Sequence, residues 1–214
     1  MENQFLNYGE KIGILLTNLG TPDSPDSKGL RRYLNQFLMD RRVVDLPRFF
    51  WVPLLKLIIL NIRPRKSAKL YRKIWTDEGS PLLSYSNKII EKICKIFKSK
   101  KGNYSIKLGM RYGNPSIESA LKIFKKEKVS KILVFPLYPQ AGSPTTSSTF
   151  DAVNNFLESE PWMPNLRFIS GYHDHPSYID LLANSVEKSF LDNGIPEKLI
   201  FSFHGMPKRY LKNG

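Results

Sequence analysis

The first long apolar run of the chain reads IGILLTNLGTP over residues 12–22. Its first five residues are apolar or glycine, and the turn-forming residues Gly20 and Pro22 come after them. This order is typical of a buried strand that ends in a turn. A nucleotide-binding loop is not favoured, because the turn has neither the spaced glycines of a dinucleotide fingerprint nor a Gly-Lys-Ser/Thr ending. The run therefore predicts the first strand of a sheet.

Strand-like and helix-like patterns alternate along the rest of the chain. A helix capped by Asp26 or Ser27 is predicted next, with apolar residues between Leu30 and Leu38 on one face. The pattern then predicts strands over residues 105–108, 131–136, 166–170 and 199–202, and helices over residues 84–97, 116–126, 149–157 and 177–191. This alternation predicts an α/β fold with a doubly wound parallel sheet and flanking helices on both faces. Ligands of such folds bind beyond the carboxyl ends of the strands.

The composition is that of a globular protein with a strongly basic surface. Of its 214 residues, 41% are hydrophobic and 24% are charged, and the formal net charge is +14. Such an excess suits nucleic acid, an anionic membrane surface or an acidic small molecule, and it is equally consistent with a solvated basic surface. Lysines are dispersed on predicted helix faces, as at Lys122, Lys125 and Lys128, rather than gathered in a stripe. This dispersal argues against a dedicated nucleic-acid surface, so no nucleic-acid partner is expected.

Cysteine content and the N-terminal residues bear on the cellular compartment. Cys94 is the only cysteine, so an intrachain disulfide is excluded and a reducing compartment fits. The first residues show neither the order of a signal peptide nor the bias of a transit peptide. A cytoplasmic, bacterial-type protein is the expectation.

An apolar segment over residues 46–66, here called the lip, follows the first predicted helix. Its core reads FFWVPLLKLIIL over residues 49–60, which is shorter than the roughly 20 apolar residues of a membrane span and is interrupted by Pro53 and Lys56. An interfacial helix over a pocket is favoured, with Arg63 and the cations after it available for anionic head groups. The alternative is an ordinary buried core helix. The first interpretation predicts peripheral contact with the inner face of a bacterial membrane.

The end of the chain carries the most specific motif, LIFSFHGMPKRY over residues 199–210. A strand of β-forming residues delivers His204 to a turn made by Gly205 and Pro207. A histidine held in this way can be a metal ligand, a general base or simply structural. The segment resembles the signature of the ferrochelatase family, in which this histidine is catalytic. The resemblance implies that His204 binds iron or accepts pyrrole protons as the metal enters the porphyrin.

The resemblance continues upstream, in the same order, to residue 12. It covers TNLGTP at 17–22, FLMDRRVVDLP at 37–47, GMRYGNP at 109–115 and FPLYPQ at 135–140. It implies a set of porphyrin-binding residues: Leu19, Arg63, Tyr71, Ser80, Arg111 and Tyr112. A guanidinium suits the propionates of a porphyrin, which supports Arg63 independently and Arg111 as a second candidate.

Two further loops bear on metals. Some ferrochelatases carry a cluster-binding cysteine in the loop over residues 141–149, where Ser143 stands here, so no iron–sulfur cluster and no other prosthetic group are expected. His173 and His175 have a spacing that zinc could use, but a surface loop in which Asp174 or Ser177 caps the next helix is favoured.

The resemblance implies a lyase of haem biosynthesis that inserts ferrous iron, as substrate, into protoporphyrin IX to make haem b. It divides the chain into a chelatase-like α/β domain over residues 1–195 and the start of a second, incomplete α/β domain over residues 196–214. The family's second domain supplies a glutamate facing the histidine, so a fragment with impaired activity is expected. The alternatives are a non-catalytic porphyrin-binding module and a basic nucleic-acid-binding domain.

Overall fold

The apolar run near the N-terminus forms a central strand of a four-stranded sheet, as predicted. In the computed structural model, which describes residues 11–208 and 210, all strand pairs are parallel and the order is β2-β1-β3-β4. The strands are β1 (Lys11–Thr21), β2 (Asn103–Gly113), β3 (Lys131–Pro136) and β4 (Asn165–Phe168). Because β1 lies between two neighbours, its residues 13–17 are buried on both faces, which is why this run is continuously apolar.

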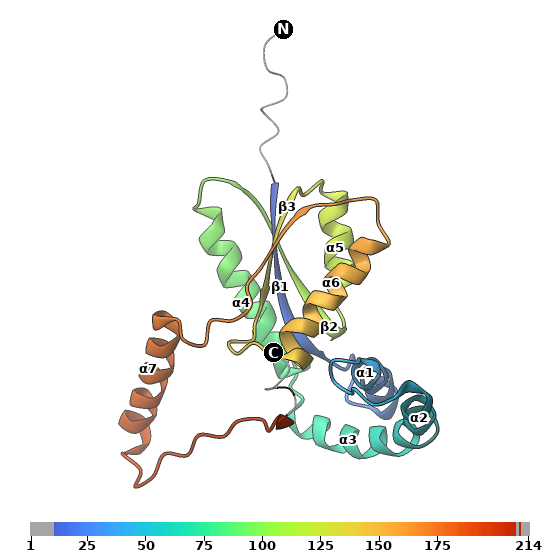
Figure 1. The fold of residues 1–214 in the computed structure, drawn as a ribbon. Coiled ribbons are helices and arrows are strands. Elements are labelled where there is room, and N and C mark those ends of the chain that lie inside the picture. Colours follow the sequence, from blue (N-terminus) through green and yellow to red (C-terminus); the bar gives the residue numbers. More distant parts are fainter. Residues whose placement is uncertain (1–10, 209, 211–214) are drawn as a thin grey trace. The chain divides into compact units, whose positions relative to one another are not determined.

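Helices connect the strands and cover both faces of the sheet. The helical elements are α1 (Ser27–Met39), α2 (Arg48–Leu54), η1 (Leu55–Ile59), α3 (Leu60–Ile74), α4 (Pro81–Lys98), α5 (Ile117–Lys126), η2 (Ser143–Ser147), α6 (Ser148–Glu158) and α7 (Pro176–Asn193), of which η1 and η2 are π-helical. Helix α4 lies on one face of the sheet, and α5 and α6 lie on the other (Figure 1). The predicted doubly wound α/β fold is therefore confirmed.

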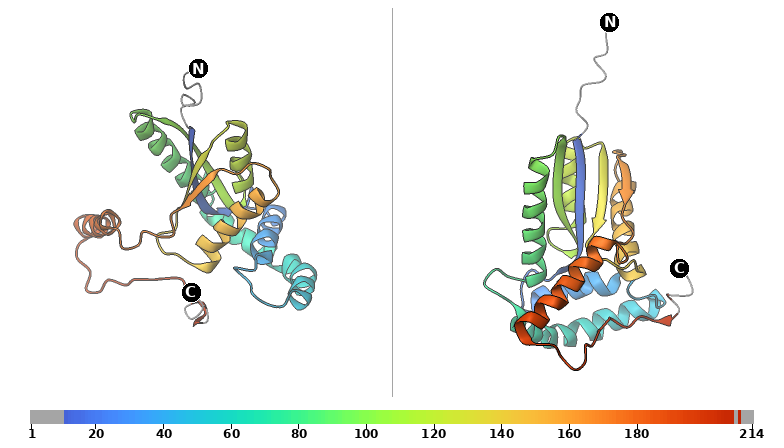
Figure 2. Two further views of the ribbon diagram at one scale, coloured as in Figure 1. Left: turned by 45° about the horizontal axis from the view of Figure 1, so that its top comes forward. Right: turned by 90° about the vertical axis from the view of Figure 1, so that its left-hand side faces the viewer.

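The strand order reverses direction at β1, which defines where a ligand can bind. From β1 the chain moves outward to β2, and it then crosses back to β3 and β4 on the other side. In doubly wound sheets the ligand crevice lies at this reversal, beyond the carboxyl ends of the strands. Helices α1 to α3 lie at this end, next to the last residues of β1 and β2 (Figure 2). We refer to this end of the sheet, where the carboxyl ends of the strands lie, as the carboxyl edge.

Two separate apolar cores hold these layers together. The first lies between the sheet and helices α5 and α6, and it includes Leu15, Phe124 and Val134, each no more than 1% exposed. The second lies among α1, α2, η1 and the end of β2, and it is built on Tyr33, Trp51 and other large side chains. Burying such a side chain fully contributes about 1.5–3 kcal/mol, so the second core ties the α1–α3 layer firmly to the carboxyl edge.

The N-terminal capping residue predicted from the sequence is confirmed for α1 and is wrong for α7. Asp26 caps α1 by accepting a hydrogen bond from the Gly29 backbone N–H at 2.7 Å. At α7 the prediction of a cap by Asp174 or Ser177 is wrong. His175 occupies that position, and its Nδ1 accepts from the Ser177 backbone N–H at 3.3 Å.

The described residues divide into two units, one ending at Ser170 and the other beginning at Gly171. The second unit contains α7, none of whose residues is buried. The strand predicted at Leu199–Ser202 is wrong, because this segment has no regular structure and Ile200 is 85% exposed. A strand needs a neighbour to accept and donate its backbone hydrogen bonds, and no described strand pairs with these residues. The domain boundary predicted between residues 195 and 196 stays a prediction.

Candidate functional site

Aromatic side chains gather at the carboxyl edge around Tyr33 of α1. The Tyr33 ring meets the rings of Tyr71 and Tyr112 edge to face, each at a centroid distance of 6.5 Å. Phe37 meets Tyr112 in the same manner at 5.2 Å, and Leu19, half-buried at the end of β1, packs against this group. The structure thus brings together three of the residues expected to bind porphyrin: Leu19, Tyr71 and Tyr112.

Burial inside this aromatic group makes its phenols even harder to ionise than a free tyrosine, which is itself neutral at physiological pH. It raises the pKa of Tyr33 and of Tyr112 well above the ordinary value for tyrosine, and desolvation is the largest cause in both cases. These hydroxyls therefore act as neutral hydrogen-bonding groups at any physiological pH, beside flat apolar ring faces. Tyr33 and Tyr112 are only 6% and 2% exposed and belong to the second core, so a flat aromatic ligand would reach this group at its half-buried members Leu19, Phe37 and Tyr71.

The end of β1 is shaped by a glycine that no other residue could replace. Gly20 has φ of +102°, and a Cβ at this position would lie 1.7 Å from the Tyr112 carbonyl oxygen. The close approach of β1 to β2 at this point therefore depends on Gly20. The next residue, Thr21, donates from Oγ1 to Ser80 Oγ at 2.8 Å, and both side chains are buried. Ser80, a fourth expected porphyrin residue, is thereby fixed beside the end of β1.

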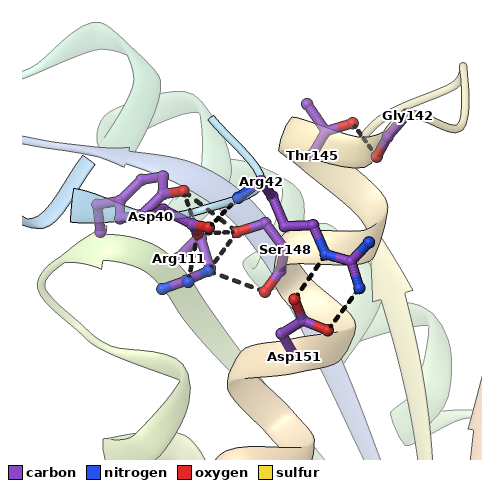
Figure 3. A network of polar contacts seen from close by, with 8 residues as sticks. Asp40, Arg42, Arg111, Gly142, Thr145, Ser148 and Asp151 are labelled. Atoms are coloured by element: carbon purple, nitrogen blue, oxygen red, sulfur yellow. Dashed lines mark hydrogen bonds and ion pairs between the residues drawn. The ribbon is translucent and has the colours of Figure 1, made fainter. Parts of the chain in front are cut away.

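The most connected polar group of the site is Asp40, which no pattern in the sequence singles out. Its side chain is only 7% exposed, and its Oδ2 accepts from Arg111 Nη2 at 2.5 Å, Tyr112 Oη at 2.7 Å and Ser148 Oγ at 2.5 Å. Figure 3 shows Arg111 and Ser148 pointing toward the Asp40 carboxylate. The sequence placed Asp40 only in a segment leading to the lip, and its partners on β2 and α6 are far away along the chain.

The electrostatics of this network favour a permanently charged carboxylate. Burial, the largest single cause, raises the pKa of Asp40, but the hydrogen bonds from Ser148, Tyr112 and the Arg42 backbone together with the charge of Arg111 outweigh it, so the pKa lies below the ordinary value. Arg111 is also held by Ser148, to whose carbonyl and hydroxyl oxygens its Nε donates at 2.9 and 2.6 Å. Arg111 thus contacts a carboxylate of its own chain in this structure.

A second ion pair links the same loop to α6. Arg42 donates from Nε and Nη2 to the two carboxylate oxygens of Asp151, at 2.7 and 3.1 Å, and the pair is partly exposed. The two-pronged geometry is visible in Figure 3. The loop before the lip is therefore attached to α6 at both Asp40 and Arg42.

The lip folds as α2, η1 and the first turns of α3, and it exposes much of its apolar surface. Trp51 is buried and donates from Nε1 to the Leu38 carbonyl oxygen at 2.7 Å, which anchors the segment to α1. Phe49, Phe50 and Leu57 are 71%, 68% and 72% exposed. An ordinary fully buried core helix is therefore not what the structure contains. Arg63 lies exposed on α3, and within the described residues no hydrogen bond or ion pair joins it to the aromatic group.

Buried hydroxyls lie near the ends of β1 and β3. Tyr138 Oη and Thr149 Oγ1 are close enough to interact with each other, whereas Thr17 Oγ1 is buried without a hydrogen bond within residues 11–208 and 210. An unsatisfied buried polar group costs about 1–3 kcal/mol, so the Thr17 oxygen is available to water or a ligand. Tyr138 belongs to the FPLYPQ motif and was not singled out from the sequence.

The residue with the strongest sequence signal, His204, lies in the second unit. It is exposed, and its Nδ1 is 2.7 Å from the carbonyl oxygen of Gly205. No three His, Cys, Asp or Glu side chains in the described part of the chain are grouped so that they could hold a metal ion.

A groove of about 560 Å³ lies between α5 and α6, and Arg111 is the one expected porphyrin-binding residue among those that line it. Over the same described residues, no helix is both long and apolar enough to cross a bilayer.

The chain is similar to proteins of one known family along nearly all of its length. A family model described as Ferrochelatase matches residues 11–214. A ferrochelatase of Alcanivorax borkumensis is 51% identical over 205 residues, which are 95% of this chain and 60% of the relative. A ferrochelatase of Marinobacter nauticus is 46% identical over 215 residues, or 100% of this chain and 58% of the relative. A third, from Thioalkalivibrio sulfidiphilus, is 50% identical over 96% of this chain and 56% of its own length.

The chain thus spans a little over half the length of these curated relatives. The match begins at the first strand and includes every motif quoted above, up to the segment that carries His204. The chain belongs to the ferrochelatase family.

Proposed function

We propose that this chain supplies the N-terminal part of a site that inserts ferrous iron into protoporphyrin IX. One observation carries the proposal beyond family membership. Residues from three separate segments (Leu19, Tyr71 and Tyr112) meet in one aromatic group at the carboxyl edge, where a doubly wound fold binds its ligand. Ser80 joins β1 next to this group.

The proposed reaction exchanges two protons for one metal ion. Both pyrrole N–H bonds break, two protons leave, and Fe²⁺ forms bonds to the four ring nitrogens. Leu19 and the aromatic group would contact the faces of the macrocycle, and Arg63 would meet the propionates. His204 would accept a proton or bind the iron at the ring centre.

The other ligand expectations follow the same proposal. Ser143 stands where some family members carry a cluster cysteine, and a hydroxyl is a poor ligand for an iron–sulfur cluster, so no cluster or other prosthetic group is included. Nucleic acid is not included either, because the cations are dispersed.

The lip supports a proposal of peripheral membrane contact. Exposed Phe49, Phe50 and Leu57 lie in the same segment as exposed Arg63 and Arg65. Apolar and cationic side chains in this combination suit the surface of an anionic bilayer. Contact at the cytoplasmic face of a bacterial inner membrane would bring the site close to an apolar substrate.

Anaerobic iron insertion is the test of the catalytic proposal. The chain as it stands and a version extended by the C-terminal part of the Alcanivorax relative are incubated with protoporphyrin IX and ferrous iron. Haem formation is followed by absorbance. The extended protein is expected to form haem, and His204→Ala in it to lower the rate by at least about a hundredfold. Porphyrin binding with no haem formation in the extended protein would instead indicate a non-catalytic binding module.

A further inference from the structure

The cations near the proposed site are in two different electrostatic states. On α3, the exposed residues Arg63, Arg65 and Lys66 form no ion pair with any part of the chain that the structure describes. On β2, Arg111 is paired with Asp40 at 2.5 Å, and its side chain is only 20% exposed. An anionic ligand therefore meets uncompensated positive charge on the α3 side and a neutral ion pair on the β2 side.

The Asp40 carboxylate is held in this pair by four hydrogen-bond donors. Besides its three side-chain donors, the backbone N–H of Arg42 donates to Oδ1 at 2.7 Å. Charge-assisted hydrogen bonds of this kind are about twice as strong as neutral ones. The carboxylate is fixed from the loop before the lip, from β2 and from α6 at once, so it holds Arg111 in one orientation.

Part of Arg111 is already engaged by its own chain. Its Nε donates to Ser148 and its Nη2 to Asp40, so the Nε–Nη2 edge of the guanidinium is occupied, while Nη1 has no hydrogen bond within the described residues. Arg111 nevertheless borders Tyr112, over whose ring its guanidinium lies at 4.6 Å. The ion pair is thus next to the aromatic group expected to contact the porphyrin.

We propose that Asp40 is a positioning residue that neutralises Arg111 and so restricts the site to porphyrins that carry their carboxylates on one edge. The inference rests on the proposed porphyrin site and deepens it. A dicarboxylic porphyrin directs both propionates toward α3 and presents its apolar edge to the neutral pair. A tetracarboxylic porphyrin must place carboxylates near β2, where no net positive charge receives them.

The test compares the affinity of two porphyrins in three charge variants. Dissociation constants for protoporphyrin IX, with two propionates, and coproporphyrin III, with four, are measured by fluorescence titration of the chain. Asp40→Asn leaves Arg111 uncompensated, and the ratio of affinities should shift toward the tetracarboxylic porphyrin by about threefold to tenfold. Arg111→Gln leaves Asp40 uncompensated, and the ratio should shift the opposite way. The double variant Asp40→Asn/Arg111→Gln should return the ratio to its native value.

A matched control separates this effect from net charge and from loosened packing. Asp151→Asn changes the net charge by the same amount as Asp40→Asn, but it releases the partly exposed Arg42, so the ratio should stay at the native value. Loss of packing alone would weaken binding of both porphyrins in all Asp40 and Arg111 variants, without opposite signs. Equal ratios in every variant would overturn the inference while leaving porphyrin binding intact. Absence of any porphyrin binding by the native chain would overturn the proposed site as well.

Discussion

At the scale of single residues, ion pairs that join distant segments decide how the carboxyl edge and the sheet are held. Asp40 joins the loop before the lip to β2 and α6, as described above. Glu127, at the end of α5, does the same for the opposite end of the sheet. Its carboxylate lies 2.8 Å from Lys11 Nζ on β1 and 3.4 Å from Lys107 Nζ on β2.

The ion pairs of Glu127 lead to a prediction about how the free energy of unfolding changes at acid pH. The hydrogen bond with Lys11 is the largest cause that lowers the pKa of Glu127 to about 2 from an ordinary value of 4.5. Because the folded pKa lies below the unfolded one, the stabilisation is complete above pH 4.5 and is lost as the pH falls toward 2. Glu127→Gln should lower the free energy of unfolding at pH 7 by about 1–2 kcal/mol and flatten its pH dependence over that window.

Urea unfolding between pH 2 and pH 7 checks this prediction. Glu118→Gln is the matched control, because Glu118 and its partner Lys122 are both 60% exposed and such pairs contribute little. Equal unfolding free energies for the Glu127 and Glu118 variants would show that Glu127 does not hold the sheet and helix together.

Individual site residues are harder to predict from the sequence than helices and strands are. Leu19, Tyr71, Ser80 and Tyr112 were predicted through resemblance, and the structure places them at one edge. Asp40 was not singled out, because its partners Arg111 and Ser148 are 71 and 108 positions away and no local pattern links them. Acidic and basic residues in loops are common, and only the fold shows which of them are buried together.

At the scale of elements, the lip combines a buried anchor with an exposed apolar surface. Trp51 and Leu55 attach it to the second core, while Phe49 and Phe50 face outward. Two prolines, Pro53 and Pro64, lie inside its helices, and a π-helical turn separates α2 from α3. These features keep the exposed phenylalanines on a short, irregular helix instead of a continuous long one.

The exposed phenylalanines of the lip lead to a prediction about membrane binding. Phe49→Ser/Phe50→Ser should weaken binding to vesicles that contain phosphatidylglycerol by at least about tenfold, because each buried phenylalanine contributes about 1.5–3 kcal/mol. The thermal unfolding temperature should not fall, since both side chains are already exposed. Co-sedimentation measures the binding.

The control for the lip experiment is Met163→Ser, which removes an 83% exposed apolar side chain from the segment between α6 and β4. This variant should bind vesicles like the native chain. If the double phenylalanine variant binds equally well, the lip is not the membrane-contacting surface.

Element prediction from sequence succeeded where periodicity and burial agree. β3 has the predicted bounds, and α5 begins directly after its cap Ser116, whose side chain accepts from the Ser119 backbone N–H. The segment at Leu199–Ser202 has equally strong β-forming residues but no neighbouring strand in the described structure. Local propensity is therefore insufficient where tertiary pairing is missing.

At the scale of the whole molecule, a doubly wound sheet, an aromatic site at its carboxyl edge and an exposed lip occur in one chain. The net charge of +14 should draw anionic ligands and anionic surfaces toward it, with an effect that weakens as salt concentration rises. The chain spans a little over half the length of its curated relatives, so the activity of a whole ferrochelatase stays a proposal here. Porphyrin binding at the carboxyl edge can be tested on this chain directly.

The most direct measurement is an equilibrium titration of the purified chain with protoporphyrin IX, read by porphyrin fluorescence and Soret absorbance. The account predicts saturable binding of one porphyrin per chain, weakened by about fivefold to tenfold in Leu19→Ser, which removes an apolar contact from the aromatic group. Ile123→Ser, at an exposed position on α5, should bind like the native chain. Binding that does not saturate, or that is equal in the Leu19 and Ile123 variants, would contradict a porphyrin site at this edge of the sheet.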